Sequence, residues 1–370
     1  MYAFSPVTNS SKGIIFIPDI SGFTHFIKKT EIIHSQHIIT ELIELIIKET
    51  GDEFSVSEIE GDAVLFFNNN SLPDFEKLTS LCITIFKKFH QHLKYYARDR
   101  ICHCGACNST EKLSLKFILH SGTITQFEVG GHQKLLGEDV IVAHRFLKNR
   151  IDQSEYILFS GDFINDSKPS SHHLNSLIIG EENLEGLDNK MYYYRSLGPF
   201  KKEIEEPPAR KSLNFPTIKT GKMVDISAQP KELLQMLTEP EHRIKWMKSL
   251  NRITLKDQKI NRILSYHECV LGGNHLEVSI EDVVTNDVGI KFFERAQMKR
   301  PLLDFMVFYH MEKKDSKITQ VGIGNHFFKS KYWIINRILL PILPLVFRFL
   351  NQINLRRLKE YTEKEYRNIL

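Results

Sequence analysis

Charge of one sign, cysteine and uninterrupted apolar runs are all scarce in this chain. Its 49 Lys and Arg residues nearly balance 45 Asp and Glu, which gives a formal net charge of +4 over 370 residues. A nucleic-acid-binding surface usually needs a stronger basic excess, so we expect no nucleic-acid partner. The hydrophobic content of 42% and charged content of 25% are typical of soluble proteins, and the length allows two domains with separate cores.

The five cysteines do not form the pattern of a disulfide framework, because their number is odd and three of them crowd into Cys102–Cys107. The first residues also lack the combination of basic, apolar and small cleavage-site residues that marks a secretory signal. We therefore expect a cytoplasmic protein.

One strongly apolar segment, Trp333–Leu350, is interrupted by Arg337, Arg348 and two prolines. A membrane-spanning helix usually needs about 20 apolar residues with few charges. The interruptions favour a buried or partly buried terminal helix over a span, and peripheral contact with a membrane surface is a third interpretation.

The charged, proline-containing stretch 201–216 indicates an interdomain linker. We predict a first domain over 10–198, a linker over 199–216 and a second domain over 217–370. Hydrophobic periodicity in the first domain predicts an α/β mixture with one sheet. Its expected helices are 36–50, 73–98 and 139–149, and its expected strands are 13–18, 54–59, 62–68, 113–120, 123–129, 156–159 and 191–196.

The second domain shows a different order of elements. We expect a strand at 218–226, a helix opened by Pro230, a series of strands and a long terminal helix. The strands are expected at 251–257, 262–270, 275–284, 289–296, 304–313 and 317–327. This order resembles the helix-grip architecture of START/SRPBCC-type domains. The resemblance implies an apolar small molecule or lipid as ligand.

Two short motifs place carboxylates at the ends of apolar strands. Asp19 ends one strand and is followed by a Ser-Gly turn, whereas Asp62 follows Gly61 and precedes the apolar run Ala63–Phe67. Paired carboxylates can hold a hard divalent cation, and a turn rich in backbone N–H groups can bind phosphate. Alternatively, each Asp serves only as a helix cap or a turn residue.

Together with Gly137-Glu138-Asp139-Val140 and Arg145, these motifs resemble the class III nucleotide cyclase homology domain over roughly 10–198. The resemblance implies an α+β, ferredoxin-like cyclase fold that binds a nucleoside triphosphate with Mg²⁺ or Mn²⁺. It also implies a head-to-tail homodimer, in which Arg145 of one chain faces the Asp pair of the other. The implied metal ligands are Asp19, Asp62 and the carbonyl of Ile20, and the implied phosphate-binding turn is Ser21, Gly22, Phe23 and Thr24.

Other positions depart from the family pattern. Ile141 stands where cyclases place an Asn that steadies the transition state, although Arg145 is kept. Glu185 occupies the place of a basic residue that contacts the triphosphate. Losing one transition-state donor typically lowers the rate about 10²–10³-fold, so we expect weak or absent cyclisation.

The base-selecting positions hold Glu58 and Lys134. Guanylate-specific members use Glu at the first position, so one interpretation is guanine recognition by Glu58. The other is a Glu58–Lys134 ion pair that fills the base pocket. The sequence leaves both open and disfavours adenine selection by the usual pair.

The cluster Cys102, His103, Cys104 and Cys107 could present three thiolates to Zn²⁺. A fourth ligand is not evident locally, and His103, His90, His92 or His120 could supply it. A reduced or redox-active cluster and an iron–sulfur centre are alternatives. Cys82 and Cys269 lie in apolar patterns and are predicted to be core residues.

The sequence thus predicts a divergent, catalytically weakened cyclase-like domain that binds a metal–nucleotide and is coupled to an apolar-ligand-binding domain in a signalling or sensory role. An active nucleotide cyclase, in particular one that prefers guanylate, is the first alternative. A lipid-binding or scaffold protein without nucleotide chemistry is the second.

Overall fold

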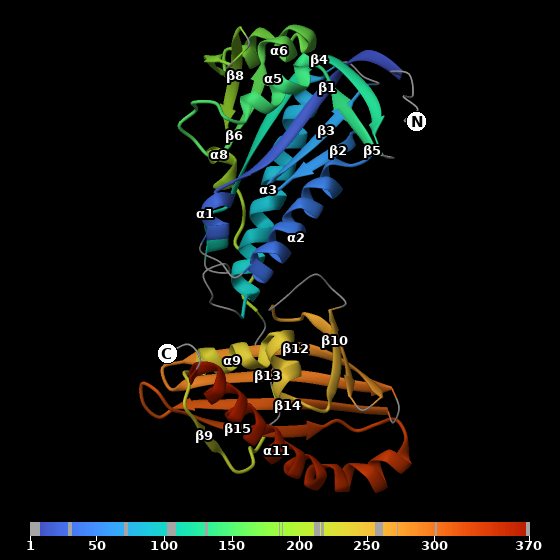
Figure 1. The fold of residues 1–370 in the computed structure, drawn as a ribbon, viewed down its shortest axis with the longest axis vertical. Coiled ribbons are helices and arrows are strands. Elements are labelled where there is room, and N and C mark those ends of the chain that lie inside the picture. Colours follow the sequence, from blue (N-terminus) through green and yellow to red (C-terminus); the bar gives the residue numbers. More distant parts are fainter. Residues whose placement is uncertain are drawn as a thin grey trace. The chain divides into compact units, whose positions relative to one another are not determined.

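The computed structural model describes residues 8–28, 32–69, 73–101, 109–129, 132–184, 186, 188–210, 215, 218–255, 262–271, 273–299 and 302–367 (Figure 1). The chain forms two compact units. The N-terminal unit comprises Met1–Arg98 with Cys104–Pro208, and the C-terminal unit comprises Asp99–His103 with Ala209–Leu370.

The N-terminal unit is built on one sheet with strand order β2-β3-β1-β4-β6-β8-β7, and β5 pairs with the C-terminal part of β4, residues Thr125–Val129. Neighbouring strands are antiparallel except β4 and β6, which run parallel. The strands are β1 (Thr8–Ser21), β2 (Ser55–Glu60), β3 (Ala63–Asn68), β4 (Ser114–Val129), β5 (His132–Leu136), β6 (Tyr156–Ser160), β7 (Ile178–Asn183) and β8 (Asn189–Ser196).

The two long helices of this unit, α2 and α3, lie side by side (Figure 1). They are joined by ion pairs such as Lys88–Glu49, and α3 buries an apolar stripe that includes Phe86 and Phe89. Such a stripe at helical spacing packs against the sheet and fixes the helix there. The helices are α1 (Phe23–Lys28), α2 (Ile32–Thr50), α3 (Phe75–Asp99), η1 (Thr110–Lys112), α5 (Glu138–Phe146), α6 (Gly161–Ser167), α7 (Ser171–Leu174) and α8 (Gly198–Lys201).

The predicted hairpin of two strands around Gly61 is present as β2 and β3. The predicted break between strands 113–120 and 123–129 is wrong, since β4 runs unbroken through Gly122. Glycine is required at position 122 because Asp139 packs closely against the strand there. A Cβ on Gly122 would lie 2.2 Å from Cγ of Asp139.

The first half of the predicted linker packs against the N-terminal unit. Ile204 is buried, and Lys94 Nζ on α3 donates a hydrogen bond to the Ile204 carbonyl at 2.6 Å. The two units divide between Pro208 and Ala209, within the predicted linker range.

The C-terminal unit contains a seven-stranded antiparallel sheet in the order β10-β11-β12-β13-β14-β15-β9. Its helix α11 runs across this sheet (Figure 1). The strands are β9 (Val224–Ile226), β10 (Leu250–Leu255), β11 (Tyr266–Leu271), β12 (Asn274–Asn286), β13 (Gly289–Lys299), β14 (Leu302–Lys313) and β15 (Thr319–Phe327), and the helices are α9 (Pro230–Thr238), α10 (Pro240–Trp246), η2 (Ile335–Leu339) and α11 (Leu340–Arg367).

Pro230 opens α9 as predicted, and a Gln229–Glu232 capping box fixes that end of the helix. The core beside it contains Trp246, whose Nε1 donates to the Met236 carbonyl at 2.8 Å. The predicted strand 218–226 is shorter in the structure, where only Val224–Ile226 pairs with β15. Cys82 and Cys269 are buried, which confirms the prediction that they are core residues.

Candidate functional site

The two predicted metal-binding carboxylates lie at the same end of neighbouring strands. Asp19 is opposite Ala63 in the β1–β3 register, and the Ile20 N–H donates to the Asp62 carbonyl at 2.9 Å. Burial raises the pKa of Asp62, and the nearby charge of Asp19 raises it further. The fold therefore brings together two acids that are 43 positions apart in the printed sequence.

The turns beside these acids also meet. Gly22 has φ +88°, and a Cβ on it would approach the Lys112 carbonyl oxygen to 2.9 Å, so the position requires glycine. Gly61 has φ +63°, and its nearest neighbour in that direction is the ring of Phe23 at 3.7 Å. The Ser21–Thr24 turn leads into α1, which is only six residues long, so a helix dipole contributes little here.

A lysine that the sequence analysis missed lies against the first acid. Lys116 is opposite Asp19 in the β1–β4 register, and its Nζ is 3.0 Å from Asp19 Oδ2. The same ammonium donates to the Leu147 carbonyl at 3.0 Å. Both side chains of the ion pair are largely buried. A single cation between Leu115 and Phe117, in a run of buried residues, was the available sequence signal for a buried ion pair.

The donor set of this site fits a hard divalent cation. Two carboxylates lie near each other there: burial and then the charge of Asp19 raise the pKa of Asp62, and the charge of Lys116 lowers it only in part. Such like-charge carboxylate pairs are stabilised by Mg²⁺ or Mn²⁺. Because Lys116 occupies one side of Asp19, its ammonium would compete with a divalent ion for that carboxylate.

The base-selecting residues form a direct ion pair, with Lys134 Nζ on β5 donating to Glu58 Oε2 on β2. His144 of α5 lies nearby, 3.9 Å from a Glu58 oxygen and 3.7 Å from a Glu60 oxygen. Glu58, Glu60 and His144 could hold a metal by their spacing. Glu58 is already engaged by Lys134, so the arrangement matches the ion-pair interpretation.

The two transition-state positions lie on α5. Ile141 is 51% exposed and offers no hydrogen-bonding group, whereas Arg145, one turn further along, is half-buried. Glu185 lies outside the described residues, as do Cys102, His103, Cys104 and Cys107.

Three of the histidines considered as a fourth zinc ligand, His120, His90 and His92, have other partners. His120 is fully buried between Ser160 Oγ at 2.8 Å and Asp139 Oδ1 at 3.1 Å. Its hydrogen bond is the main cause of a lowered pKa at Asp139. Although these three residue types also form hydrolase triads, Ser160 is buried and caps α6, so the arrangement is structural.

His90 and His92 are likewise engaged. His90 lies 3.3 Å from Ser114 Oγ, and burial followed by the charge of Lys201 lowers the pKa of His90 to about 4. His92 lies 3.2 Å from a Glu41 oxygen.

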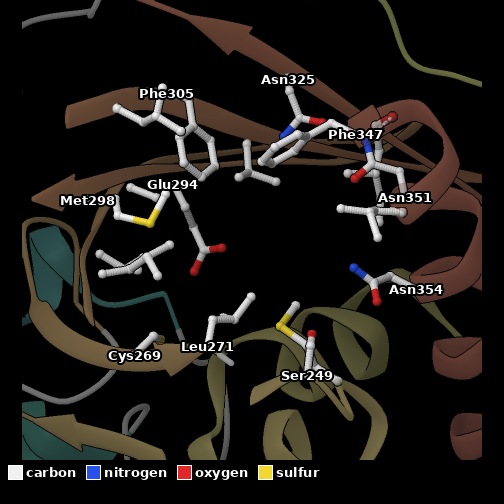
Figure 2. A pocket seen from close by; sticks show the side chains of 18 of the residues that line it. Ser249, Cys269, Leu271, Glu294, Met298, Phe305, Asn325, Phe347, Asn351 and Asn354 are labelled. Carbon is white, nitrogen blue, oxygen red and sulfur yellow. Dashed lines mark hydrogen bonds between the residues drawn. The ribbon is translucent and has the colours of Figure 1, made fainter. Parts of the chain in front are cut away.

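The C-terminal unit contains a cavity of about 450 Å³ between its sheet and α11 (Figure 2). Its wall is mostly apolar, and the carboxylate of Glu294 points into the open space. A cavity of this size and character is typical of small-molecule sites. Lining residues include Leu271, Leu276, Met298, Phe305, Val307 and Ile323 from the sheet and Leu343, Phe347, Asn351 and Asn354 from α11.

A buried ion pair forms the polar part of this cavity. Arg243 of α10 donates through both terminal nitrogens to Glu294 of β13, with Nη2 2.7 Å from Oε2, and Glu294 is only 1% exposed. Burial acts to lower the pKa of Arg243, but the Glu294 carboxylate outweighs it and keeps the guanidinium charged. Among the described residues, Arg243 Nε has no hydrogen-bond partner. The pair carries no net charge and leaves one donor unsatisfied.

Comparisons with known proteins concern only part of the chain. A family model described as "Protein of unknown function (DUF2652)" matches residues 39–156. An uncharacterized protein of Mycobacterium tuberculosis is 28% identical over 125 residues, which are 33% of this chain and 57% of that protein. The match therefore spans little more than half of the curated relative.

Among solved structures, adenylyl and guanylyl cyclase domains are similar to about half of this chain. A bacterial light-regulated adenylyl cyclase is 16% identical with a TM-score of 0.39, and the match covers 54% of this chain and 57% of that one. The guanylate cyclase domain of RhGC from Catenaria anguillulae, solved in complex with GTP, is 18% identical with a TM-score of 0.36, over 50% of this chain and 95% of that one. The guanylyl cyclase domain of the RhoGC fusion protein from Blastocladiella emersonii is 19% identical with a TM-score of 0.37, over 52% and 99%.

Proposed function

We propose that the N-terminal unit binds a divalent metal–nucleoside triphosphate with little or no cyclisation, and that the C-terminal unit binds an apolar small molecule, so that the protein serves a sensory or signalling role. The observation that carries the first part is the convergence of Asp19 and Asp62 beside two glycine turns, Gly22 and Gly61. This geometry supports the metal assignment that the sequence motifs imply.

In this proposal Asp19, Asp62 and the Ile20 carbonyl hold Mg²⁺ or Mn²⁺, and the Ser21–Thr24 turn contacts phosphate. The ion, when bound, neutralises negative charge on the triphosphate. A head-to-tail homodimer would place Arg145 of one chain at the Asp pair of another, and equilibrium sedimentation measures whether it forms.

Three features of the site argue against efficient turnover. Ile141 cannot donate or accept a hydrogen bond. Lys134 binds Glu58, so base recognition would first have to break an ion pair. Lys116 already neutralises Asp19. Together they support a nucleotide-binding role over a catalytic one.

The proposal for the C-terminal unit rests on the cavity between its sheet and α11. A seven-stranded antiparallel sheet that holds one long helix is the arrangement of a helix-grip domain and supports that assignment. Because Arg243 and Glu294 neutralise each other, an anionic ligand would bring an uncompensated charge into a buried site. The preferred ligand class is therefore a neutral apolar molecule.

The N-terminal proposal is tested by titrating the protein with Mn²⁺ and each of the four nucleoside triphosphates in a calorimeter, with product analysis by mass spectrometry. We expect metal-dependent binding that Asp19→Ala abolishes and that Asp52→Ala, a change at an exposed acid, leaves unchanged. Unaltered affinity in Asp19→Ala would show the metal assignment to be wrong.

The same experiment separates the alternatives. A cyclic product that disappears in Asp62→Ala would make the protein an active cyclase. Adenylate turnover gained on exchanging Glu58→Lys together with Lys134→Asp would show a working site of altered specificity. Co-purified lipid without nucleotide binding would favour a lipid-binding or scaffold protein.

The cavity is tested by native mass spectrometry of the purified protein and its organic extract. We expect a neutral apolar molecule to be retained by the wild type. Ala296→Phe, which fills the cavity from its wall, should release it, whereas Val284→Phe at an exposed position should not. Retention by Ala296→Phe would place the molecule elsewhere.

A further inference from the structure

The first half of the C-terminal helix exposes a continuous apolar surface. The short π-helix η2 runs directly into α11, and large side chains three or four positions apart fall on one side of this continuous helix. Leu345 is 70% exposed, and Phe349 and Trp333 are 68% exposed. We call this surface the apolar face, and it consists of Trp333, Ile334, Ile338, Ile342, Leu345 and Phe349.

The other side of the same helix is held by the unit itself. Leu343 and Phe347 line the cavity, and further along the helix Leu355 and Leu358 are fully buried against the sheet. The helix therefore packs against the unit along one side only. A contiguous apolar patch of this kind on a folded unit marks an interaction surface.

The charged residues of the segment that carries the apolar face have one sign. From residue 316 to residue 359 the sequence has eight Lys or Arg and no Asp or Glu. Lys329 and Lys331 precede the face, Arg337 and Arg348 lie within its span, and all four are exposed. Tyr332 and Trp333 stand at its start, and aromatic residues of these types are enriched where membrane proteins meet the headgroup region.

We propose that the apolar face docks on the surface of a lipid bilayer containing anionic lipids. Apolar side chains beside exposed basic residues are the composition of helices that lie in the membrane interface, where both features contribute to binding. A negatively charged bilayer complements the unbroken basic character of this segment better than a zwitterionic one.

The structure favours lying on the bilayer over crossing it. Ile335–Glu365 is long and apolar enough to span a membrane by length and composition, and 17% of its most apolar window is buried. However, Arg337 and Arg348 fall in the exposed half, and the opposite side of the helix closes the cavity. A spanning orientation would remove that wall and expose the apolar interior of the sheet to water.

Docking would place the bilayer on the outer side of a helix whose inner side lines the cavity. If the cavity binds an apolar molecule as proposed above, that molecule can pass from the bilayer into the cavity beside α11. This consequence rests on the proposed function, but the docking itself does not.

The test is co-sedimentation of the full chain with vesicles of phosphatidylcholine alone and with vesicles that also contain phosphatidylserine. We expect binding to the second kind, weakened by salt. Trp333 is exposed and the other tryptophan, Trp246, is buried, so a blue shift of fluorescence on binding reports Trp333. Trp333→Phe should abolish that shift.

Leu345→Asp with Phe349→Asp should reduce vesicle affinity at least about tenfold, because it places two charges on the apolar face. Val288→Asp is the matched control, since Val288 is an exposed apolar residue in another part of the unit. Circular dichroism confirms that the variants fold, and calorimetric binding of the metal–nucleotide by the N-terminal unit tests the other proposal separately.

Three results would overturn docking on an anionic bilayer. One is absence of binding to both kinds of vesicle, and another is binding that the double Asp variant leaves unchanged. The third is equal binding to phosphatidylcholine alone, which would remove the assignment of anionic lipid. If the protein does not bind vesicles but forms a dimer that the double Asp variant dissociates, the apolar face contacts a second copy of the chain.

Discussion

Lys116 Nζ lies 3.0 Å from Asp19 Oδ2, on the carboxylate that the sequence motif assigns to a metal ion. The ammonium reaches across from β4 to β1, and its second bond to the Leu147 carbonyl holds it there. The pKa of Asp62 is raised by burial and by the charge of Asp19, and the charge of Lys116 offsets this only in part. A divalent ion bound at Asp19 would therefore compete with Lys116 for the carboxylate.

Lys116→Met should raise the affinity for Mn²⁺. The substitution removes the competing ammonium and keeps most of the aliphatic volume, so both carboxylates become available to the ion. We expect an increase of about tenfold, since a neighbouring unit charge in a partly buried site is worth at least ~1.4 kcal/mol. Calorimetric titration with Mn²⁺ measures it.

Lys12→Met is the matched control, because Lys12 lies on the same strand and pairs with Asp166 instead. Its Mn²⁺ affinity should equal that of the wild type. An unchanged affinity in Lys116→Met would mean that Asp19 does not contribute to metal binding.

Ile141→Asn should raise nucleotide cyclisation if the metal half of the site is competent. The side chain is 51% exposed, so the change costs little stability. It restores a hydrogen-bonding group one helical turn before Arg145, at the position where the resembled family has one. The expected gain in rate is about 10²–10³-fold over Ile141→Ala, measured as cyclic product by mass spectrometry.

Suppose that Ile141→Asn binds nucleotide and yet forms no more cyclic product than the wild type. That result would show that another part of the site prevents cyclisation. The Glu58–Lys134 ion pair is then the next position to exchange.

The sequence was sufficient for features that depend on neighbours along the chain. Asp19 and Asp62 are recognisable because each ends or precedes an apolar strand beside a glycine, and Pro230 is recognisable because it opens a helix. The β2–β3 hairpin follows from the alternation around Gly61. These are local effects of backbone conformation and side-chain period.

The missed features depend on strand register and on packing between distant segments. Lys116 meets Asp19 only through the β1–β4 register, and Arg243 meets Glu294 across 51 positions of sequence. A charged residue beside Phe292 and Phe293 was a signal of burial, but it named no partner. The predicted break between strands 113–120 and 123–129 is wrong because the sequence does not distinguish a bend at Gly122 from its close approach to Asp139.

Replacing only one partner of the Arg243–Glu294 ion pair should strongly reduce the stability of the C-terminal unit. Arg243→Met or Glu294→Met leaves an unpaired buried charge and should reduce the free energy of unfolding by about 3–5 kcal/mol. The double variant removes both charges and should lose clearly less than the sum of the single losses. Urea denaturation followed by tryptophan fluorescence measures this, because Trp246 lies in the core of the same unit.

Losses that add up in the double variant would contradict direct coupling between the two charges. Arg295→Met provides a comparison, because Arg295 pairs with Asp304 at a half-exposed position on the same strand. It should cost no more than about 1 kcal/mol.

Each unit contains a buried histidine that should make its stability fall in acid. Burial lowers the pKa of His267 to about 4, with Arg243 adding to the effect, and burial likewise lowers the pKa of His90 to about 4. The unfolded chain takes up these protons near pH 6.5, about the ordinary value for histidine. Between about pH 6.5 and pH 4 the unfolded state therefore binds more protons, so stability is complete above that window and is lost as the pH falls through it.

Each histidine should contribute up to about 3 kcal/mol to this loss. His267→Gln should flatten the pH dependence of the transition seen by tryptophan fluorescence, since both tryptophans belong to the C-terminal unit. His90→Gln should leave that transition unchanged and alter only the part of the circular dichroism signal that comes from the N-terminal unit. An equally steep loss of C-terminal stability between about pH 6.5 and pH 4 in His267→Gln would assign the acid sensitivity to other groups.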